Sequence, residues 1–317
     1  MGKKSRQRQR SEDPGPAADG PGARQPCPCG SGRRYKACHG SRDSSSPYVA
    51  RPFEGLPAEA DLVALREFVP AATAPVELAP SVENPEGRSV QLCSLLPGAT
   101  PAMVRQDGSI WLGLQVQHGY GDPSRDLGAV LEEALKADPG SLVGLSAPPG
   151  DGARLQDLLA DAPVTVTVHE GFDYWVADVD DADGSMAGAL EAANEAAAPT
   201  VRITAVPAAY WTSMGDREYL RWVLPHSEDR VLDALARLRV LGDVSLVEGD
   251  RLIGMFRTHG LVVPVWDLPV GTGAEALEEP LDAFSARFEE ALGRDDALTS
   301  DERASRAGLA SRQLTIR

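Results

Sequence analysis

Short stretches with alternating apolar and polar residues recur through the chain, and single helical stretches interrupt them. Every second residue is aliphatic in 110–116, and Val164, Val166 and Val168 alternate with polar neighbours. A period of two residues is typical of a half-buried β-strand. Hairpins of such strands separated by single helices predict an α+β fold with a mainly antiparallel sheet, not alternating βαβ units.

Local signals divide the chain into expected elements. The expected strands are 89–96, 101–106, 110–116, 142–145, 164–168, 172–178, 201–206, 210–213, 218–224, 244–247, 251–257 and 261–266. The expected helices are 56–69, a helix capped by Ser124 that stops at Pro139-Gly140, 153–160, 184–197, 227–242, 275–292 and 300–310. Ser227 and the Thr299-x-x-Glu302 capping box mark two of the helix starts.

The order of elements also suggests an internal repetition. Residues 101–178 and 202–266 both run hairpin, helix and then strands. We therefore expect two similar halves, 51–198 and 199–317, although their residues match poorly.

Length and composition restrict the class of protein. The chain has 317 residues, 42 % of them hydrophobic and 25 % charged, which fits one large or two smaller globular domains. No apolar run approaches the ~18 residues of a membrane span, and the basic start is not followed by a signal-peptide core. Four cysteines do not make a disulfide framework. The sequence therefore predicts a cytoplasmic protein.

Charge is divided unevenly between the start of the chain and the rest. Residues 1–42 hold ten Lys/Arg and three Asp/Glu, a net charge of +7, so the remainder of this −16 chain carries −23. Such asymmetry suggests a basic arm for an anionic partner, attached to an acidic body that repels nucleic acid and membranes. The alternative is a solubilising surface with an inert tail.

Composition sets the expected domain boundaries. Residues 1–26 are basic and then rich in Pro, Gly and Ala, so they have little to bury and are expected to be disordered. Residues 27–40 are cysteine-rich, 41–50 read as a serine-rich linker, and 51–317 form the α+β body.

One short segment carries recognisable chemistry. Cys27, Cys29, Cys38 and His39 lie within thirteen residues, and three thiolates with one imidazole are a standard tetrahedral zinc set. With all four ligands supplied by protein, the Zn²⁺ would be structural, and its binding would supply the folding free energy of a segment that has no core. The alternative is free or redox-active cysteines, but the spacing is C-x-C and not the redox C-x-x-C.

The pattern Cys-x-Cys-Gly-Ser-Gly-x-x-Tyr-Lys-x-Cys-His over residues 27–39 resembles the SEC-C zinc motif of the bacterial preprotein translocase motor ATPase tail. The resemblance implies zinc binding through Cys27, Cys29, Cys38 and His39, and contact with the export chaperone and the ribosome. It departs from the translocase because the motif is N-terminal and the chain has no phosphate-binding G-x-x-x-x-G-K-[ST] loop. Motor activity is therefore not implied.

The whole arrangement is similar to an actinobacterial family with a domain of unknown function. The likeness rests on the basic start, the SEC-C motif and a body ending in LASRQLTIR at 309–317. It implies no activity for the body.

Candidate catalytic groups in the body are weak. His118, His169, His226 and His259 could act as bases or ligands, and His118 with Asp122 is the least implausible pair. Cys93 between leucines is expected to be buried packing. Tyr210 to Arg221 is the other stretch where a ligand groove could form. His169 is expected on the polar face of its strand, and His226 belongs to a solvated helix start.

Two further patterns have ordinary explanations. The acidic run 178–188 fails the calcium-loop spacing at its first and twelfth positions, so it is expected to be an acidic turn before a helix. The five tryptophans, all in expected strands, could stack bases, but the acidic body favours core packing.

Three functions follow from these observations. The first is a non-enzymatic, zinc-binding adaptor whose residues 1–40 dock on an anionic partner, the ribosome or the export chaperone. The second is an enzyme or small-ligand protein with its site in residues 90–270, although no catalytic motif is recognisable. The third is a non-specific nucleic-acid-binding protein acting through residues 1–42.

Overall fold

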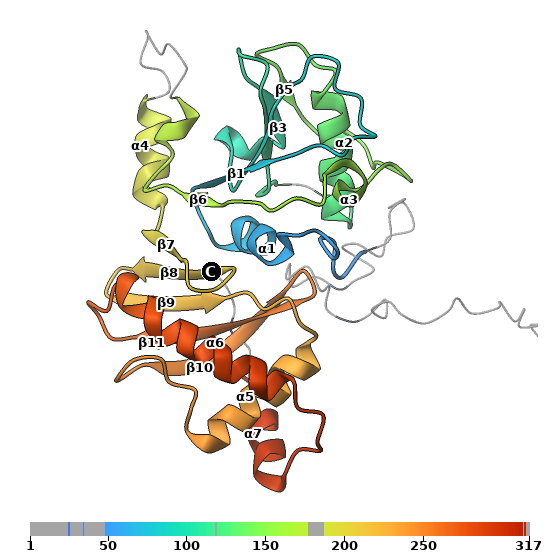
Figure 1. Cartoon of the computed structure of the whole chain (residues 1–317). Helices are drawn as coiled ribbons and strands as arrows, with labels where there is room; N and C mark the ends of the chain where they lie inside the picture. The colour runs from blue at the N-terminus through green and yellow to red at the C-terminus, as the bar shows by residue number, and fades with distance from the viewer. Residues whose placement is uncertain are drawn as a thin grey trace, which may run out of the picture.

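The computed structural model describes residues 25, 34, 48–117, 119–176, 187–312 and 314. The expected basic tail, zinc motif and linker lie almost entirely outside these residues. Within them the chain forms two β-sheets with one helix, α1 (Glu59–Glu67), between them (Figure 1). The α+β class with mainly antiparallel pairing is confirmed.

The first sheet has six strands in the order β5-β3-β4-β2-β1-β6. They are β1 (Ala72–Val76), β2 (Val90–Cys93), β3 (Ala102–Val104), β4 (Ile110–Gly113), β5 (Leu142–Val143) and β6 (Thr167–Val168). All pairs are antiparallel except β2 with β4, which run parallel. The helices α2 (Pro123–Ala134) and α3 (Leu155–Leu158) belong to the same core as the aliphatic face of this sheet.

The other face of the first sheet carries a smaller aromatic cluster. Here lie the 3₁₀ turn η3 (Asp173–Trp175) and the helix α4 (Ala187–Ala196). A further 3₁₀ turn, η2 (Pro97–Ala99), lies between β2 and β3 in the chain. Phe172 and Trp175 are buried together, with ring centroids 4.3 Å apart.

The second sheet has five strands in the order β10-β11-β9-β8-β7, all antiparallel. They are β7 (Thr200–Ile203), β8 (Ala209–Met214), β9 (Arg217–Trp222), β10 (Arg251–Thr258) and β11 (Leu261–Leu268). One face packs against the helices α5 (Glu228–Leu241), α6 (Glu278–Leu292) and α7 (Ser300–Ala310), with the turn η4 (Glu275–Leu277) before α6. Trp222 and Trp266 are buried in this core, as expected for packing tryptophans.

α1 joins the two sheets because both of its sides are covered. Every residue from Glu59 to Leu65 is buried, including Asp61. The core that contains its leucines also contains Leu92 and Leu112 of the first sheet and Tyr210 and Val263 of the second. The two sheets therefore share one hydrophobic core.

The two sheets lie on either side of the expected boundary between residues 198 and 199. The parallel β2–β4 pair has no counterpart in the second sheet. A relationship between two halves stays a prediction.

The helix starts with the clearest local signals are where the sequence predicts them. Ser227 is the N-cap of α5, and Gly242 ends it in a left-handed conformation with φ 82°. The capping box of α7 is complete, because the Glu302 N–H donates to Thr299 Oγ1 and the Thr299 N–H to Glu302 Oε2 at 2.7 Å.

Two expected strands are wrong. Residues 172–175 form a 3₁₀ turn, because the Phe172 N–H donates to Asn194 Oδ1 at 2.7 Å and the Trp175 N–H to the Phe172 carbonyl. Residues 244–247 form turns, because the Asp250 carboxylate accepts the N–H groups of Leu246 and Val247 that a strand would use.

The start of α2 also differs from its prediction. Asp122, not Ser124, is the N-cap, and Pro123 takes the first helical position. Ser124 is fully buried and accepts the Leu155 N–H at 3.1 Å, so it joins α2 to α3.

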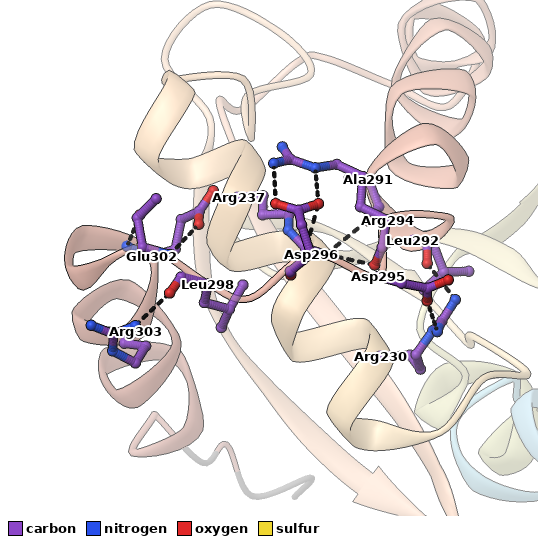
Figure 2. Close-up of polar contacts among 11 residues, drawn as sticks. Arg230, Arg237, Ala291, Leu292, Arg294, Asp295, Asp296, Leu298, Glu302 and Arg303 are labelled. Carbon is purple, nitrogen blue, oxygen red and sulfur yellow. Dashed lines mark hydrogen bonds and ion pairs between the residues drawn. The ribbon is translucent and has the colours of Figure 1, made fainter.

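A polar network fixes the loop between α6 and α7 to α5 (Figure 2). Arg237, 4 % exposed, donates to the carbonyl oxygens of Ala291, Arg294 and Asp296. Arg230 donates to the Leu292 carbonyl at 2.7 Å. The loop has no regular secondary structure, and two arginines of α5 satisfy carbonyl groups that would otherwise lack a donor.

Candidate functional site at the junction of the sheets

The C-terminal end of α1 faces the turn between β10 and β11. His259 and Gly260 form this two-residue turn with φ values of 47° and 78°, the signature of a type I′ hairpin. His259 Nε2 lies 2.8 Å from Glu67 Oε1 and 3.2 Å from Arg66 Nε. One ring nitrogen holds either a proton or a lone pair, so it donates to Glu67 or accepts from Arg66, but not both at once.

The loop after β4 closes the same end of α1. The Gln115 side-chain amide donates to the Leu65 carbonyl at 2.7 Å and to the Val69 carbonyl at 2.9 Å. Arg66 Nη1 donates to the Leu114 carbonyl. Gln115 therefore satisfies the Leu65 carbonyl in the last turn of α1 and the Val69 carbonyl just beyond it, while Arg66 ties the helix back to the loop after β4.

A buried carboxyl group lies under the following loop. Asp126, in the first turn of α2, is 4 % exposed, and its Oδ2 accepts the Tyr120 N–H at 2.8 Å. Its Oδ1 has no hydrogen-bond partner among the described residues. Burial raises the pKa of Asp126 to about 6; the Asp122 carboxylate adds to this shift, and Tyr120 N–H and Arg66 oppose it.

We call Arg66, Glu67, Asp126 and His259 the junction cluster. A hollow of about 260 Å³, open to solvent, lies beside it and is lined by Arg66, Glu67, Ala99 and residues 115–117. Burial alone would raise the pKa of Glu67, but the hydrogen bond and charge of His259, with the charge of Arg66, lower it. The cluster thus combines a carboxylate held ionised with a carboxyl group that titrates near neutrality, a combination typical of proton-transfer sites.

The junction cluster also lies next to the point where the described chain enters the body. The Val49 N–H donates to the Gly121 carbonyl at 2.9 Å, in the loop that covers Asp126. Phe53 is fully buried, and its ring lies 5.6 Å from that of His259.

The expected pair His118–Asp122 is only partly described. His118 lies outside the described residues. Asp122 is 2 % exposed and pairs with Arg154 Nε at 2.9 Å and more weakly with Arg125 at 3.6 Å. As the N-cap of α2, bound by arginines, it has a structural role.

The expected groove between Tyr210 and Arg221 is filled by α1. The Tyr210 hydroxyl, fully buried, donates to Asp61 Oδ1 at 2.6 Å, and Arg202 pairs with the same carboxylate at 3.3 Å. Burial and the Asp61 charge raise the pKa of Tyr210 well above its ordinary value. Trp211 points to the opposite face, where it donates to Glu218 at 2.8 Å.

The remaining candidates have structural contacts. Cys93 is buried, as expected, and burial raises its thiol pKa to about 12, so it holds its proton. His169 bonds Thr73 at 2.8 Å and stacks on Tyr174, and His226 lies 3.7 Å from Glu289. Trp175 lies in η3, not in a strand.

The metal ligands predicted at Cys27, Cys29, Cys38 and His39 lie outside the described residues, as does most of the acidic run 178–188. Within the described ranges no group of three or more His, Cys, Asp or Glu side chains is placed to hold a metal ion. No helix there is long and apolar enough to cross a membrane.

The fold and the motif define the class: a two-sheet α+β body preceded by a SEC-C motif. The SEC-C family model matches residues 24–41. A second model, described as a family of unknown function (DUF5926), matches residues 52–317, and the chain belongs to this family. No curated protein and no solved structure gives a significant match.

Proposed function

We propose that this protein is a zinc-binding adaptor that docks through its N-terminal SEC-C motif and basic arm. The SEC-C match at residues 24–41 is the observation that carries this proposal. Cys27, Cys29, Cys38 and His39 occupy the ligand positions of the motif. Three thiolates and an imidazole fill a tetrahedral zinc shell, so the metal would hold the segment in shape and activate no substrate.

Charge supports an anionic docking partner. Residues 1–42 carry a net charge of +7, and Arg33, Arg34 and Lys36 lie inside the motif itself. We propose the ribosome as this partner and the export chaperone as the alternative; direct binding of nucleic acid through residues 1–42 would use the same cations. The acidic body would then be presented to a second protein. Reduced thiolates and a free Cys93 fit the cytoplasm as the place where it acts.

The test compares two full-length variants with the natural chain. Cys27→Ser with Cys29→Ser removes two expected zinc ligands, and Cys93→Ala removes the one cysteine outside the motif. Zinc content and co-sedimentation with purified ribosomes at low salt are measured for each. We expect one zinc per chain and ribosome binding for the natural protein and Cys93→Ala, and loss of both for the double variant.

Other results would redirect or reject the proposal. Zinc without ribosome binding, together with capture by the purified export chaperone, would move the partner to the chaperone. Binding to ribosomal RNA alone that weakens steeply with salt would favour the nucleic-acid function. A natural chain without zinc would refute the proposal.

An enzyme or small-ligand function is the second candidate, and the junction cluster favours it. Asp126 is buried, its Oδ1 has no partner among the described residues, and its pKa is about 6. It interacts electrostatically with Arg66, which lines the hollow together with Glu67. A thermal-shift screen of small metabolites tests this function on the natural chain and on Asp126→Asn. A compound that stabilises only the natural chain supports it, and equal shifts for both proteins contradict it.

A further inference from the structure

β10 forms the outer edge of the second sheet, and its centre is built to accept another strand. Met255 lies opposite Pro264 of β11. Proline has no N–H to donate, so this is a non-hydrogen-bonded pair, and the Met255 N–H and C=O point away from β11. Edge groups of this kind are templates for strand addition.

The C-terminal residues of the chain use this edge. The Met255 N–H donates to the Arg312 carbonyl at 3.3 Å, and the Leu314 N–H donates to the Met255 carbonyl at 3.0 Å. In parallel pairing, one residue bonds through its N–H and its C=O to two residues of the neighbouring strand that are two positions apart. Met255 bonds to Arg312 and Leu314 in this way. Leu314 is half-buried against the shared core.

Gly254 makes room for this contact. A Cβ at this position would lie 2.8 Å from the Arg312 carbonyl oxygen and 3.1 Å from Leu314 Cγ. Its three nearest atoms would all belong to the C-terminal segment. A side chain here would thus meet whatever strand lies on this edge.

The edge extends beyond the two bonds that occupy it. By the alternation of the ladder, the backbone of Arg257 also faces outward, and no described residue bonds to it. The described residues of the C-terminal segment meet β10 through two backbone hydrogen bonds, whereas β11 pairs with β10 from Arg251 to Thr258.

We propose that the outer edge of β10 is a strand-addition site for an extended polypeptide segment of a partner protein. The chain's own C-terminal residues fill this site until the partner displaces them. Backbone groups of Met255 and Arg257 would supply affinity, as in other β-augmentation sites. The space beside Gly254 would select a segment that places a leucine-like side chain where Leu314 lies.

The experiment uses full-length protein and a labelled peptide with the sequence of residues 311–317. Leu314→Asp should loosen the chain's own segment, and Leu142→Asp is the control because Leu142 is 68 % exposed on a distant edge. Fluorescence anisotropy should show about tenfold tighter peptide binding to Leu314→Asp than to the natural chain or Leu142→Asp.

A change in the peptide makes the test independent of protein folding. Methylation of the peptide nitrogen at the Leu314 position removes the donor to the Met255 carbonyl, and we expect it to weaken binding about tenfold. Equal binding of the methylated peptide, or no gain for Leu314→Asp over Leu142→Asp, would overturn the proposal. A natural dimer that Leu314→Asp converts to a monomer would also overturn it, because the occupant would then be a second copy of the chain.

Discussion

The Tyr210 hydroxyl on β8 and the Asp61 carboxylate on α1 form a 2.6 Å hydrogen bond across the joint between the second sheet and the rest of the protein. Both residues are buried, and Arg202 shares the carboxylate. A charged group inside a shared core is tolerated only with such partners. The contact therefore sets the position at which α1 packs on the second sheet.

Replacing Tyr210 by Phe should destabilise the protein. The change removes the shorter hydrogen bond and leaves Asp61 Oδ1 with only the 3.3 Å contact from Arg202 Nε, which costs about 1–3 kcal/mol. Urea denaturation of the full chain measures this difference. Tyr219→Phe is the matched control because the Tyr219 hydroxyl contacts the exposed Arg217, and we expect no change. Equal stabilities for the two variants would show that the buried bond contributes nothing.

Replacing Asp126 by Asn should stabilise the protein near neutral pH. The pKa of Asp126 is about 6 in the folded chain and close to its ordinary 3.8 in the unfolded chain. The unfolded state thus loses this proton first as pH rises, and stability falls between about pH 4 and 6. Above pH 6 the destabilisation by the ionised, buried Asp126 is complete, roughly 3 kcal/mol, and an Asn at this position does not cause it.

Urea denaturation of both proteins from pH 4 to pH 8 checks this prediction. Other carboxyl groups titrate in the same range, so the informative quantity is the difference between the two proteins. It should grow in favour of Asn up to pH 6 and then stay constant. A difference that is independent of pH would contradict a raised pKa.

Replacing Arg237 by Met should loosen the loop between α6 and α7. Three carbonyl groups lose their donor in a buried place, at a cost of about 2–4 kcal/mol. Hydrogen exchange of the amides in 293–298 should accelerate along with the loss of global stability. Arg230→Met is the control because Arg230 is half exposed, and it should cost less than about 1 kcal/mol.

Two helical glycines should respond oppositely to alanine. In α2, a Cβ on Gly128 would overlap the Ala153 carbonyl oxygen and lie 3.1 Å from its carbon, so Gly128→Ala should destabilise by about 1–3 kcal/mol. In α7, a Cβ on Gly308 would meet no atom within 4 Å. Gly308→Ala should therefore stabilise by about 0.5–1 kcal/mol. Thermal unfolding measures the change in melting temperature of each variant relative to the natural chain. Changes of the same sign for both variants would contradict the close packing at Gly128.

Where the fold could be predicted from sequence, the signals were local. α5 begins after Ser227 and ends at Gly242 because the cap, the acidic first turn and the left-handed glycine are adjacent in the chain. Residues 172–175 and 244–247 were mispredicted as strands because their backbone is bound by Asn194 and Asp250, which a periodicity does not register. The strand β1 is not among the expected strands, because its pairing with β2 and β6 defines it.

Of the junction cluster, His259 was a candidate from the sequence, but Arg66, Glu67 and Asp126 were missed for a related reason. The helical spacing near residue 62 predicts one apolar stripe, yet α1 is covered on both sides and buries Glu59 and Asp61 as well. In the sequence, Asp126 is an acidic residue in the first turn of a helix, a common position that gives no indication of burial. The available signal was its position four residues after Asp122, which places two acids on one side of the helix start.

The hydrogen bond from Val49 to Gly121 has a mechanical consequence. A load applied to the N-terminal residues would enter the body at this bond and at the buried ring of Phe53. Gly121 belongs to the loop that covers Asp126. Tension on the leading segment would therefore pull on the loop whose Tyr120 N–H donates to the Asp126 carboxylate. When the protein is tethered by its leading segment, the Val49–Gly121 bond therefore carries force to the loop above the junction cluster.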